Sequence, residues 1–294
     1  MDFELTPDQQ MITDGLQRLL AERYDFEHRK AHLFGAPGWS RDMWSRYAEM
    51  GLLGLPFAQS DGGLGCGPVE TMIVSEAFGR ALALEPYIPT VLLAGGCLRL
   101  AGTPAQRSDL VPRIAEGSEL LAFAHVERQA RYDLADVTTT AQRPTASADW
   151  TLNGAKSFVL HADTADKLIV STRVSGRQRD RSGLALFLVD SNAPGVARRA
   201  YVMQDGMRAA DVTLSNVRVS SDSLLGTAGD ALPIIERVVD YTIAALCAEA
   251  VGAMTRAHEL TVEYLKVRKQ FGAPIGSFQA LQHRAVDMLV MIEQ

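Results

Sequence analysis

A long helical run near the C-terminus limits what this chain can fold into. From Pro233 to Val267 no second proline interrupts a pattern of Ile, Val, Leu and Ala, which predicts one helix longer than any other in the chain. A last helix follows, with apolar positions at Leu281, Ala285, Met288 and Ile292. Two helices with continuous apolar stripes need partners to cover those stripes. We therefore expect a helical bundle in this region, and we expect that the chain is truncated after Gln294.

The N-terminal third is also predicted to be helical. Thr6, Pro7 and Gln9 form a helix start with a capping box. Apolar residues recur at helical spacing in the segments that follow, and Pro68 and Pro104 each begin a further helix. These segments predict an N-terminal helical domain over residues 1–118.

Near residue 120 the pattern changes to short apolar or alternating runs separated by Gly, Asp, Asn and Ser. This predicts a β-domain over residues 119–226, a sandwich or a barrel, before a C-terminal helical domain over 227–294. The fold class is therefore α+β with several domains. The expected strands are 120–126, 137–142, 150–152, 168–173, 184–189, 196–203 and 212–219.

Composition excludes several classes of protein. The 29 Lys and Arg residues against 35 Asp and Glu give a net charge of −6, which argues against a nucleic-acid-binding surface. The N-terminus has no signal-peptide pattern, and no stretch of eighteen uncharged apolar residues predicts a membrane span. Cys66, Cys97 and Cys247 are far apart and suggest neither a disulfide framework nor a metal site. We expect a cytoplasmic protein.

The connection between the last two predicted helices is a polar corner. Residues 268–279 read RKQFGAPIGSFQ, with two cations, a Phe-Gly break and a serine, Ser277, that we expect to cap the last helix. A guanidinium there can make forked bonds to phosphate oxygens, so the corner can hold a large anionic ligand. Alternatively, Arg268 and Lys269 only complement the dipole of the preceding helix.

This corner resembles the RKQFG…FQ signature of the acyl-CoA dehydrogenase family, and the order of helices, β-domain and helices makes the resemblance extend over all 294 residues. The resemblance implies FAD as cofactor. It also implies that Arg268, Phe271 and Gln279 bind the adenosine diphosphate half of a neighbouring subunit's FAD, with Lys269 and Gln270 beside them.

The predicted β-domain carries further parts of the family pattern. Residues 152–156, LNGAK, match the xNGxK turn that leads to the flavin-packing segment. Phe158 then corresponds to the aromatic residue that stacks on the flavin, whereas Leu160 replaces a threonine whose hydroxyl bonds to the ring. Earlier in the same domain, the resemblance also assigns cofactor contacts to Phe123, His125 and Val126.

Residues 124–133 depart from the family's A-x-T-E-P-x-x-G-S-D run, although Glu127 and Asp133 match it in place. The pattern His125, Arg131, Tyr132 is similar to a subgroup, the small-subunit type of pimeloyl-CoA dehydrogenase, whose members can pair with a larger subunit. The resemblance assigns Tyr132 and Asp240 to the acyl-CoA substrate. Arg128 and Arg131 either contact CoA phosphates or are simply solvated. His125 either contacts the cofactor or is a structural histidine.

The family reaction removes a proton α to a thioester carbonyl and a hydride from the β-carbon, and the electrons pass to an electron-transfer flavoprotein. It needs a carboxylate base. The position used in some relatives is Thr242 here, which cannot serve, and the one weak candidate is Glu249, seven residues later on nearly the same helix face. Without that base we expect poor turnover from this chain alone.

Three functions stay open at this point. The first is an acyl-CoA dehydrogenase subunit in a homo-oligomer or hetero-oligomer. The second is a non-catalytic partner that donates Arg268, Phe271 and Gln279 to a neighbour, and the third is a flavin monooxygenase or oxidase on the same fold.

Overall fold

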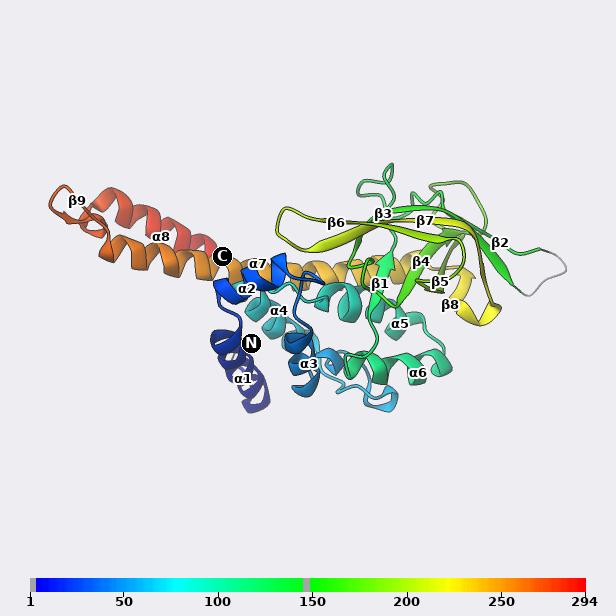
Figure 1. Ribbon diagram of the computed structural model, residues 1–294, viewed down its shortest axis with the longest axis horizontal. Coiled ribbons are helices and arrows are strands. Elements are labelled where there is room, and N and C mark those ends of the chain that lie inside the picture. The colour runs from blue at the N-terminus through cyan, green and yellow to red at the C-terminus, as the bar shows by residue number, and fades with distance from the viewer. Residues whose placement is uncertain (1–3, 145–148) are drawn as a thin grey trace. The chain divides into compact units, whose positions relative to one another are not determined.

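The computed structural model describes residues 4–144 and 149–294, and along the chain helices are followed by a sheet and then by helices again (Figure 1). This order confirms the predicted α+β class. The α-helices are α1 (Pro7–Arg23), α2 (Phe26–Phe34), α3 (Arg41–Glu49), α4 (Pro68–Ala81), α5 (Gly95–Ala101), α6 (Pro104–Ala115), α7 (Leu232–Val267) and α8 (Gln279–Glu293), with a π-helical segment at Ile88–Ala94.

The chain divides into two compact units. One comprises the chain up to Lys30, Val69–Ala83 and Ile243–Gln294, and the other comprises Ala31–Pro68 and Leu84–Thr242. The division falls inside α7, between Thr242 and Ile243. The boundaries that the sequence suggested, after residues 118 and 226, stay predictions.

Capping residues begin two of the N-terminal helices as the sequence predicts. The backbone N–H of Gln9 donates to the Thr6 hydroxyl over 3.3 Å, and the backbone N–H of Thr6 donates to the Gln9 side chain over 2.9 Å. Thr103 and Gln106 form the same reciprocal pair at the start of α6. Each pair satisfies backbone donors that a helix start leaves without partners.

The second unit contains one eight-stranded sheet with the order β6-β7-β3-β2-β4-β5-β8, and β1 pairs in parallel with β4. Its apolar inner face packs around Leu152, Leu168, Phe187 and Val212, all fully buried. The strands are β1 (Leu121–Ala124), β2 (Thr140–Gln142), β3 (Trp150–Leu160), β4 (Lys167–Arg173), β5 (Leu184–Asp190), β6 (Val196–Val202), β7 (Arg208–Val219) and β8 (Leu224–Gly229).

Strand β3 differs most from its prediction. Asn153 and Gly154 do not end a short strand; they lie inside one that continues to Leu160, with a register irregularity between Leu152 and Gly154. Gly154 has φ +151°, and a Cβ there would lie 2.7 Å from the Thr139 Cα. Glycine is therefore required at this bulge because the neighbouring backbone is too close for any side chain.

In the first unit α4 and α7 approach each other at two glycines. A Cβ on Gly79 would lie 1.8 Å from the carbonyl oxygen of Glu249, and a Cβ on Gly252 would lie 1.9 Å from that of Glu76. Close backbone contact of this kind needs residues without side chains. Arg80 and Glu259 add an ion pair of 2.5 Å between the same two helices.

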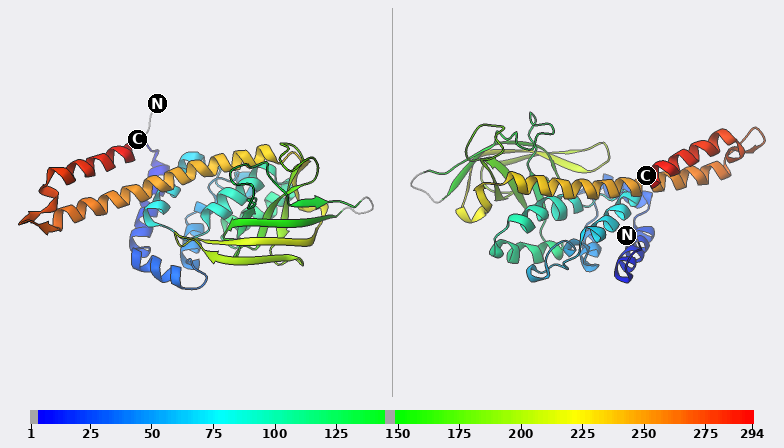
Figure 2. Two further views of the ribbon diagram at one scale, coloured as in Figure 1. Left: turned by 90° about the horizontal axis from the view of Figure 1, so that it is seen from above. Right: turned by 180° about the vertical axis from the view of Figure 1, so that it is seen from behind.

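Helix α8 runs back alongside the C-terminal part of α7 in both views of Figure 2, and the His258 ring lies 3.1 Å from the carbonyl oxygen of Ala285. The predicted cap at Ser277 is wrong, because α8 begins after Phe278 and the Ser277 hydroxyl donates to the Pro274 carbonyl over 2.7 Å. Within the described residues α7 alone is long and apolar enough to cross a membrane, a property that core helices of soluble proteins share.

Candidate functional site

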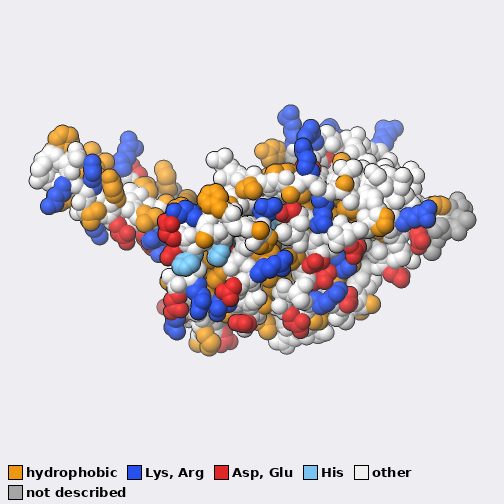
Figure 3. Space-filling view, viewed as in Figure 1, with side chains coloured by type: hydrophobic (Ala, Val, Ile, Leu, Met, Phe, Trp, Pro, Cys, Tyr) orange, Lys and Arg blue, Asp and Glu red, His pale blue; other side chains and the backbone are white. Residues whose placement is uncertain are grey.

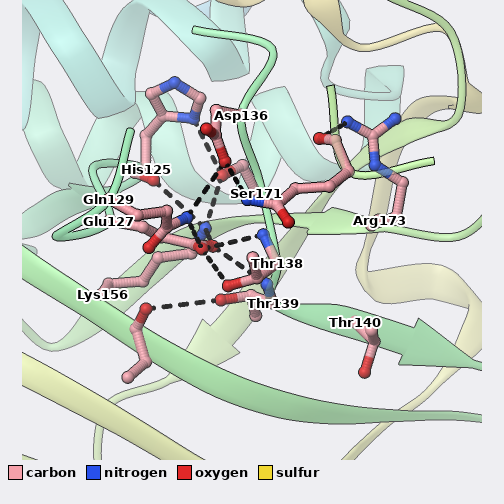
Figure 4. A network of polar contacts seen from close by, with 12 residues as sticks. His125, Glu127, Gln129, Asp136, Thr138, Thr139, Thr140, Lys156, Ser171 and Arg173 are labelled. Atoms are coloured by element: carbon pink, nitrogen blue, oxygen red, sulfur yellow. Dashed lines mark hydrogen bonds and ion pairs between the residues drawn. The ribbon is translucent and has the colours of Figure 1, made fainter. Parts of the chain in front are cut away.

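A buried ion pair lies at the centre of the second unit. The Lys156 Nζ, on β3, donates to Glu127 Oε1 over 2.8 Å, and the two side chains are 0% and 1% exposed. Lys156 also donates to the His125 carbonyl over 3.1 Å and to the Ser171 hydroxyl over 2.9 Å (Figure 4). All three protons of the ammonium group therefore have acceptors, as a buried cation requires.

Both carboxylate oxygens of Glu127 also have hydrogen-bond donors. Its carboxylate accepts from the backbone N–H groups of Thr138 and Thr139 over 2.8 and 3.0 Å, from the Thr138 hydroxyl, and from the Gln129 amide over 2.8 Å. Burial tends to raise the pKa of Glu127, but the Lys156 charge and these hydrogen bonds hold it well below its usual value. Burial lowers the pKa of Lys156 to about 8, although Glu127 opposes the shift. The pair fixes the segment after β1 to the sheet.

His125 belongs to the same network. Its Nδ1 lies 2.9 Å from the Ser171 Oγ, and its ring stacks on Phe123 with centroids 5.4 Å apart and planes 5° from parallel. Burial, followed by the nearby Lys156 charge, lowers the pKa of His125 to about 3. The imidazole is therefore neutral, and the Ser171 hydroxyl, which already accepts from Lys156, has its proton available for Nδ1. His125 and Phe123 thus support the first strand of the site.

Phe158 has the conformation most suggestive of a ligand. Its φ is +57°, it lies within a second register irregularity of β3, between Lys156 and Val159, and its side chain is 52% exposed. Left-handed backbone in a bulky residue is unfavourable and is concentrated at functional sites. The neighbouring Ser157 N–H donates to the Val126 carbonyl over 2.8 Å, and Val126 is itself 38% exposed. Phe158 and Val126 therefore offer an apolar surface that suits a flat conjugated ring.

Leu160, at the end of β3, is half-buried. It has no hydroxyl to offer a ring, as the sequence indicated. Together with Phe123, His125, Val126 and Phe158 it lies on β1, on β3 or directly after β1, so the structure gathers five of the predicted cofactor residues in one unit. Their contacts with FAD stay a prediction.

The corner at residues 268–279 lies in the first unit. Lys269–Gln270 pair with Ala273–Pro274 as β9 and β10, and the two central residues of the turn, Phe271 and Gly272, have φ values of +54° and +82°, as in a type I′ hairpin. Phe271 is 94% exposed and touches only the edge of Phe278 among aromatic rings of the described chain.

This corner also presents four polar side chains to solvent. Arg268, Lys269, Gln270 and Gln279 are exposed, and none of their side chains makes a hydrogen bond or ion pair with a residue that the structure describes. Forked donors and an aromatic face on one turn suit an anionic, ring-bearing ligand. This is what FAD's adenosine diphosphate half presents.

The predicted substrate residues are both exposed. Tyr132 is 99% exposed and follows Arg131, whose φ is +51°. Asp240 is exposed on α7, while its neighbour Glu236 pairs with Arg181 over 2.6 Å. Their roles stay predictions.

The two helix positions considered for the base differ. Thr242 is 4% exposed and its hydroxyl donates to the Val238 carbonyl over 2.8 Å, so it contributes no base. Glu249, in the first unit, is half-buried where α7 closes on Gly79.

Sequence reasoning missed the residues that complete the buried network. Ser171, Thr138 and Thr139 contact Lys156 or Glu127 across 11 to 15 positions of sequence. A usable signal existed for Ser171, since a polar residue inside the apolar strand 167–173 needs a buried partner.

Comparison with known proteins follows the same order of domains. The acyl-CoA dehydrogenase N-terminal, middle and C-terminal domain models match residues 6–118, 122–219 and 229–294. An acryloyl-CoA reductase (NADH) of Anaerotignum propionicum is 29% identical, with 98% of this chain and 73% of that protein covered. A probable acyl-CoA dehydrogenase, YngJ, of Bacillus subtilis is 29% identical over 100% of this chain and 77% of its own length. A crystal structure of an FAD-dependent dehydrogenase has a TM-score of 0.87 at 26% identity and covers 100% of this chain and 77% of that one.

Proposed function

Because this chain belongs to the acyl-CoA dehydrogenase family of oxidoreductases, we propose that it carries out FAD-dependent α,β-dehydrogenation of an acyl-CoA thioester to a trans-2-enoyl-CoA. The two electrons removed from the thioester then pass to an electron-transfer flavoprotein. The observation that carries this proposal is Phe158, half-exposed at a left-handed backbone position beside Val126. FAD, when bound, accepts the electron pair that leaves the substrate.

The chain's own residues position and shield this chemistry. The Glu127–Lys156 pair fixes the backbone that carries His125 and Val126. Phe158 supplies a stacking face, and backbone donors replace the hydroxyl that Leu160 lacks. Arg268, Phe271 and Gln279 bind the adenosine diphosphate half of an FAD, in a homo-oligomer or in a hetero-oligomer with a second subunit of the same family.

Replacing Phe158 tests the assignment of the stacking face. We expect Phe158→Ala to weaken FAD binding by about tenfold or more, because aromatic contacts add about 0.5–1.5 kcal/mol beyond the area they bury. Titration of apoprotein with FAD, followed by flavin fluorescence, measures this. Phe34→Ala is the matched control, since Phe34 is 84% exposed on α2. Equal FAD affinity in all three proteins contradicts the assignment.

Glu249 remains the candidate base in this proposal, although its backbone contact with Gly79 also supports a role in helix packing. Glu249→Gln distinguishes the two roles, because it keeps the size of the side chain. A base predicts loss of turnover with FAD still bound. Unchanged turnover removes Glu249 from the mechanism.

A second function is favoured by the burial of Thr242 at the position of a family base. In it this chain donates Arg268, Phe271 and Gln279 to the FAD of a catalytic neighbour. Reduction of flavin by acyl-CoA only after a second subunit is added supports this alternative. We also propose a cytoplasmic location, supported by three free cysteines among the described residues.

A further inference from the structure

A pocket of about 540 Å³ lies on the sheet of the second unit. It is formed by β3, β6, β7 and the segment after β1. Val212 and Lys156 pair across β7 and β3 with their side chains fully buried. Side chains alternate along a strand, so Asp211 and Thr213 point away from the face of Val212, and they line the pocket together with Ser157 and with atoms of Lys156 and Val212.

Positive charge dominates the pocket. Arg128, Arg198 and Arg199 line it against one carboxylate, Asp211, but the Arg198 guanidinium donates to the backbone carbonyls of residues 162 and 165. Arg199 donates to Asp211 over 2.6 Å and is 77% exposed, so its guanidinium keeps further donors. The Arg199 hydrogen bond, with help from the Phe158 backbone and the Arg128 charge, lowers the pKa of Asp211. Asp211 therefore stays ionised and orients Arg199.

Arg128 is the uncommitted donor of the pocket. It is exposed, and it makes no hydrogen bond or ion pair with any residue in the described part of the chain. Its backbone is nevertheless held, because the adjacent Glu127 is fixed by Lys156 and the two threonines. Figure 3 shows Lys and Arg side chains gathered over the part of the sheet where β3 and the loop after β1 lie. A guanidinium on fixed backbone is suited to anion recognition.

The pocket also adjoins the proposed flavin surface. After the Arg199 hydrogen bond, the Phe158 backbone also helps to lower the pKa of Asp211, so it lies close to that carboxyl. A volume of about 540 Å³ exceeds what a free phosphate needs and is ordinary for a nucleotide fragment. Ser157, Thr138 and Thr213 add hydroxyl groups to the lining that Arg128 and Arg199 share.

We propose that Arg128 and Arg199 form a phosphate clamp that binds the phosphate-ester end of a nucleotide cofactor in this pocket. The proposal rests on the proposed function, which supplies two ligands that carry phosphate groups. These are FAD, through its diphosphate, and CoA, through its phosphates. Each guanidinium makes charge-assisted bonds to phosphate oxygens. Asp211 holds Arg199 in place and does not contact the ligand.

The test uses Arg128→Gln and Arg199→Gln in the full chain, with Arg218→Gln as the control. Arg218 is exposed on the same strand as Asp211 and lies outside the pocket. Fluorescence titration gives the affinity of apoprotein for FAD, and calorimetry on FAD-loaded protein gives the affinities for CoA and 3′-dephospho-CoA. Inorganic pyrophosphate is titrated separately. Circular dichroism checks that each variant is folded.

We expect each pocket variant to lose about 10- to 100-fold in affinity for one cofactor, as removal of a hydrogen bond to a charged group does, while the control does not change. Loss for FAD alone identifies its diphosphate as the ligand. Loss for CoA alone identifies CoA, and an equal loss with 3′-dephospho-CoA places the diphosphate in the clamp.

The pyrophosphate titration separates this proposal from the proposed function. Weaker pyrophosphate binding by both variants supports the clamp even if the protein does not oxidise acyl-CoA. If both variants bind FAD, CoA and pyrophosphate as the unaltered protein does, the clamp is overturned, whatever the enzyme's activity. Should Arg199→Gln unfold because Asp211 loses its partner, Arg128→Gln alone decides.

Discussion

Two sets of charged residues in this chain have opposite surroundings. The Glu127–Lys156 pair is buried, and every ammonium proton and both carboxylate oxygens have partners inside the second unit. Arg268 and Lys269, in the first unit, are exposed beside the β9–β10 turn and have no side-chain partner among the described residues. The first arrangement uses charge to fix backbone, whereas the second keeps charge available. The buried, fully paired charges therefore serve the fold, and the exposed charges of the turn stay available for the binding role proposed above.

Breaking the buried pair should have the largest effect. We expect Lys156→Met to lower the free energy of unfolding by about 3–5 kcal/mol, because Glu127 is left as an uncompensated buried charge. Urea denaturation measures the change, and Lys269→Met in the exposed turn is the control, with an expected change within about 0.5 kcal/mol. Similar losses in both variants would remove the distinction between the two regions.

Acid should weaken the interior before it affects the exposed turn. The pKa of His125 is about 3 in the folded protein, below the value of about 6.5 in an unfolded chain. The unfolded state therefore binds more protons in this interval, and stability falls as pH drops below about 6.5, by up to about 1.4 kcal/mol per pH unit. His161, whose pKa burial lowers to about 4, adds a second contribution of the same sign.

Urea midpoints at pH 7 and pH 5 test this dependence. His125→Gln should reduce the slope, and His283→Gln, at an exposed position on α8, is the control. A protein equally stable at both values of pH does not hold its buried histidines neutral.

The exposed turn should affect binding and leave stability alone. We expect Arg268→Gln to weaken FAD binding by about 10- to 100-fold, since hydrogen bonds to charged groups contribute about 1.5–3 kcal/mol. The free energy of unfolding should stay within about 0.5 kcal/mol. Arg284→Gln, an exposed arginine of α8, is the control in a flavin titration. Reduced stability with unchanged FAD affinity would show that Arg268 has only a structural role.

The sequence predicted those parts of the fold that depend on local chemistry. The capping pairs at Thr6 and Thr103 and the long helix α7 follow from adjacent residues. Strand β3 was predicted too short because glycine at 154 is required by the approach of Thr139, the residue just before β2, which is distant in sequence. β8 was missed since its residues, Leu224–Gly229, include two glycines, which are uncommon in strands.

The candidate site divides in the same way. The family pattern identified Phe158 and the residues of the exposed turn by their positions in the sequence. It gave no indication that Ser171 accepts from Lys156 or that Asp211 orients Arg199, because both contacts depend on the pairing of strands. Those partners are visible only in the folded sheet.

An anaerobic absorbance titration tests the central claim most directly. Protein reconstituted with FAD is mixed with a series of acyl-CoA thioesters, and the visible absorbance band of the oxidised flavin is followed. A dehydrogenase predicts that at least one saturated thioester bleaches the band and yields the corresponding enoyl-CoA. Protein that binds FAD yet keeps the band unchanged with every thioester, alone and with a partner subunit added, would contradict the proposed function.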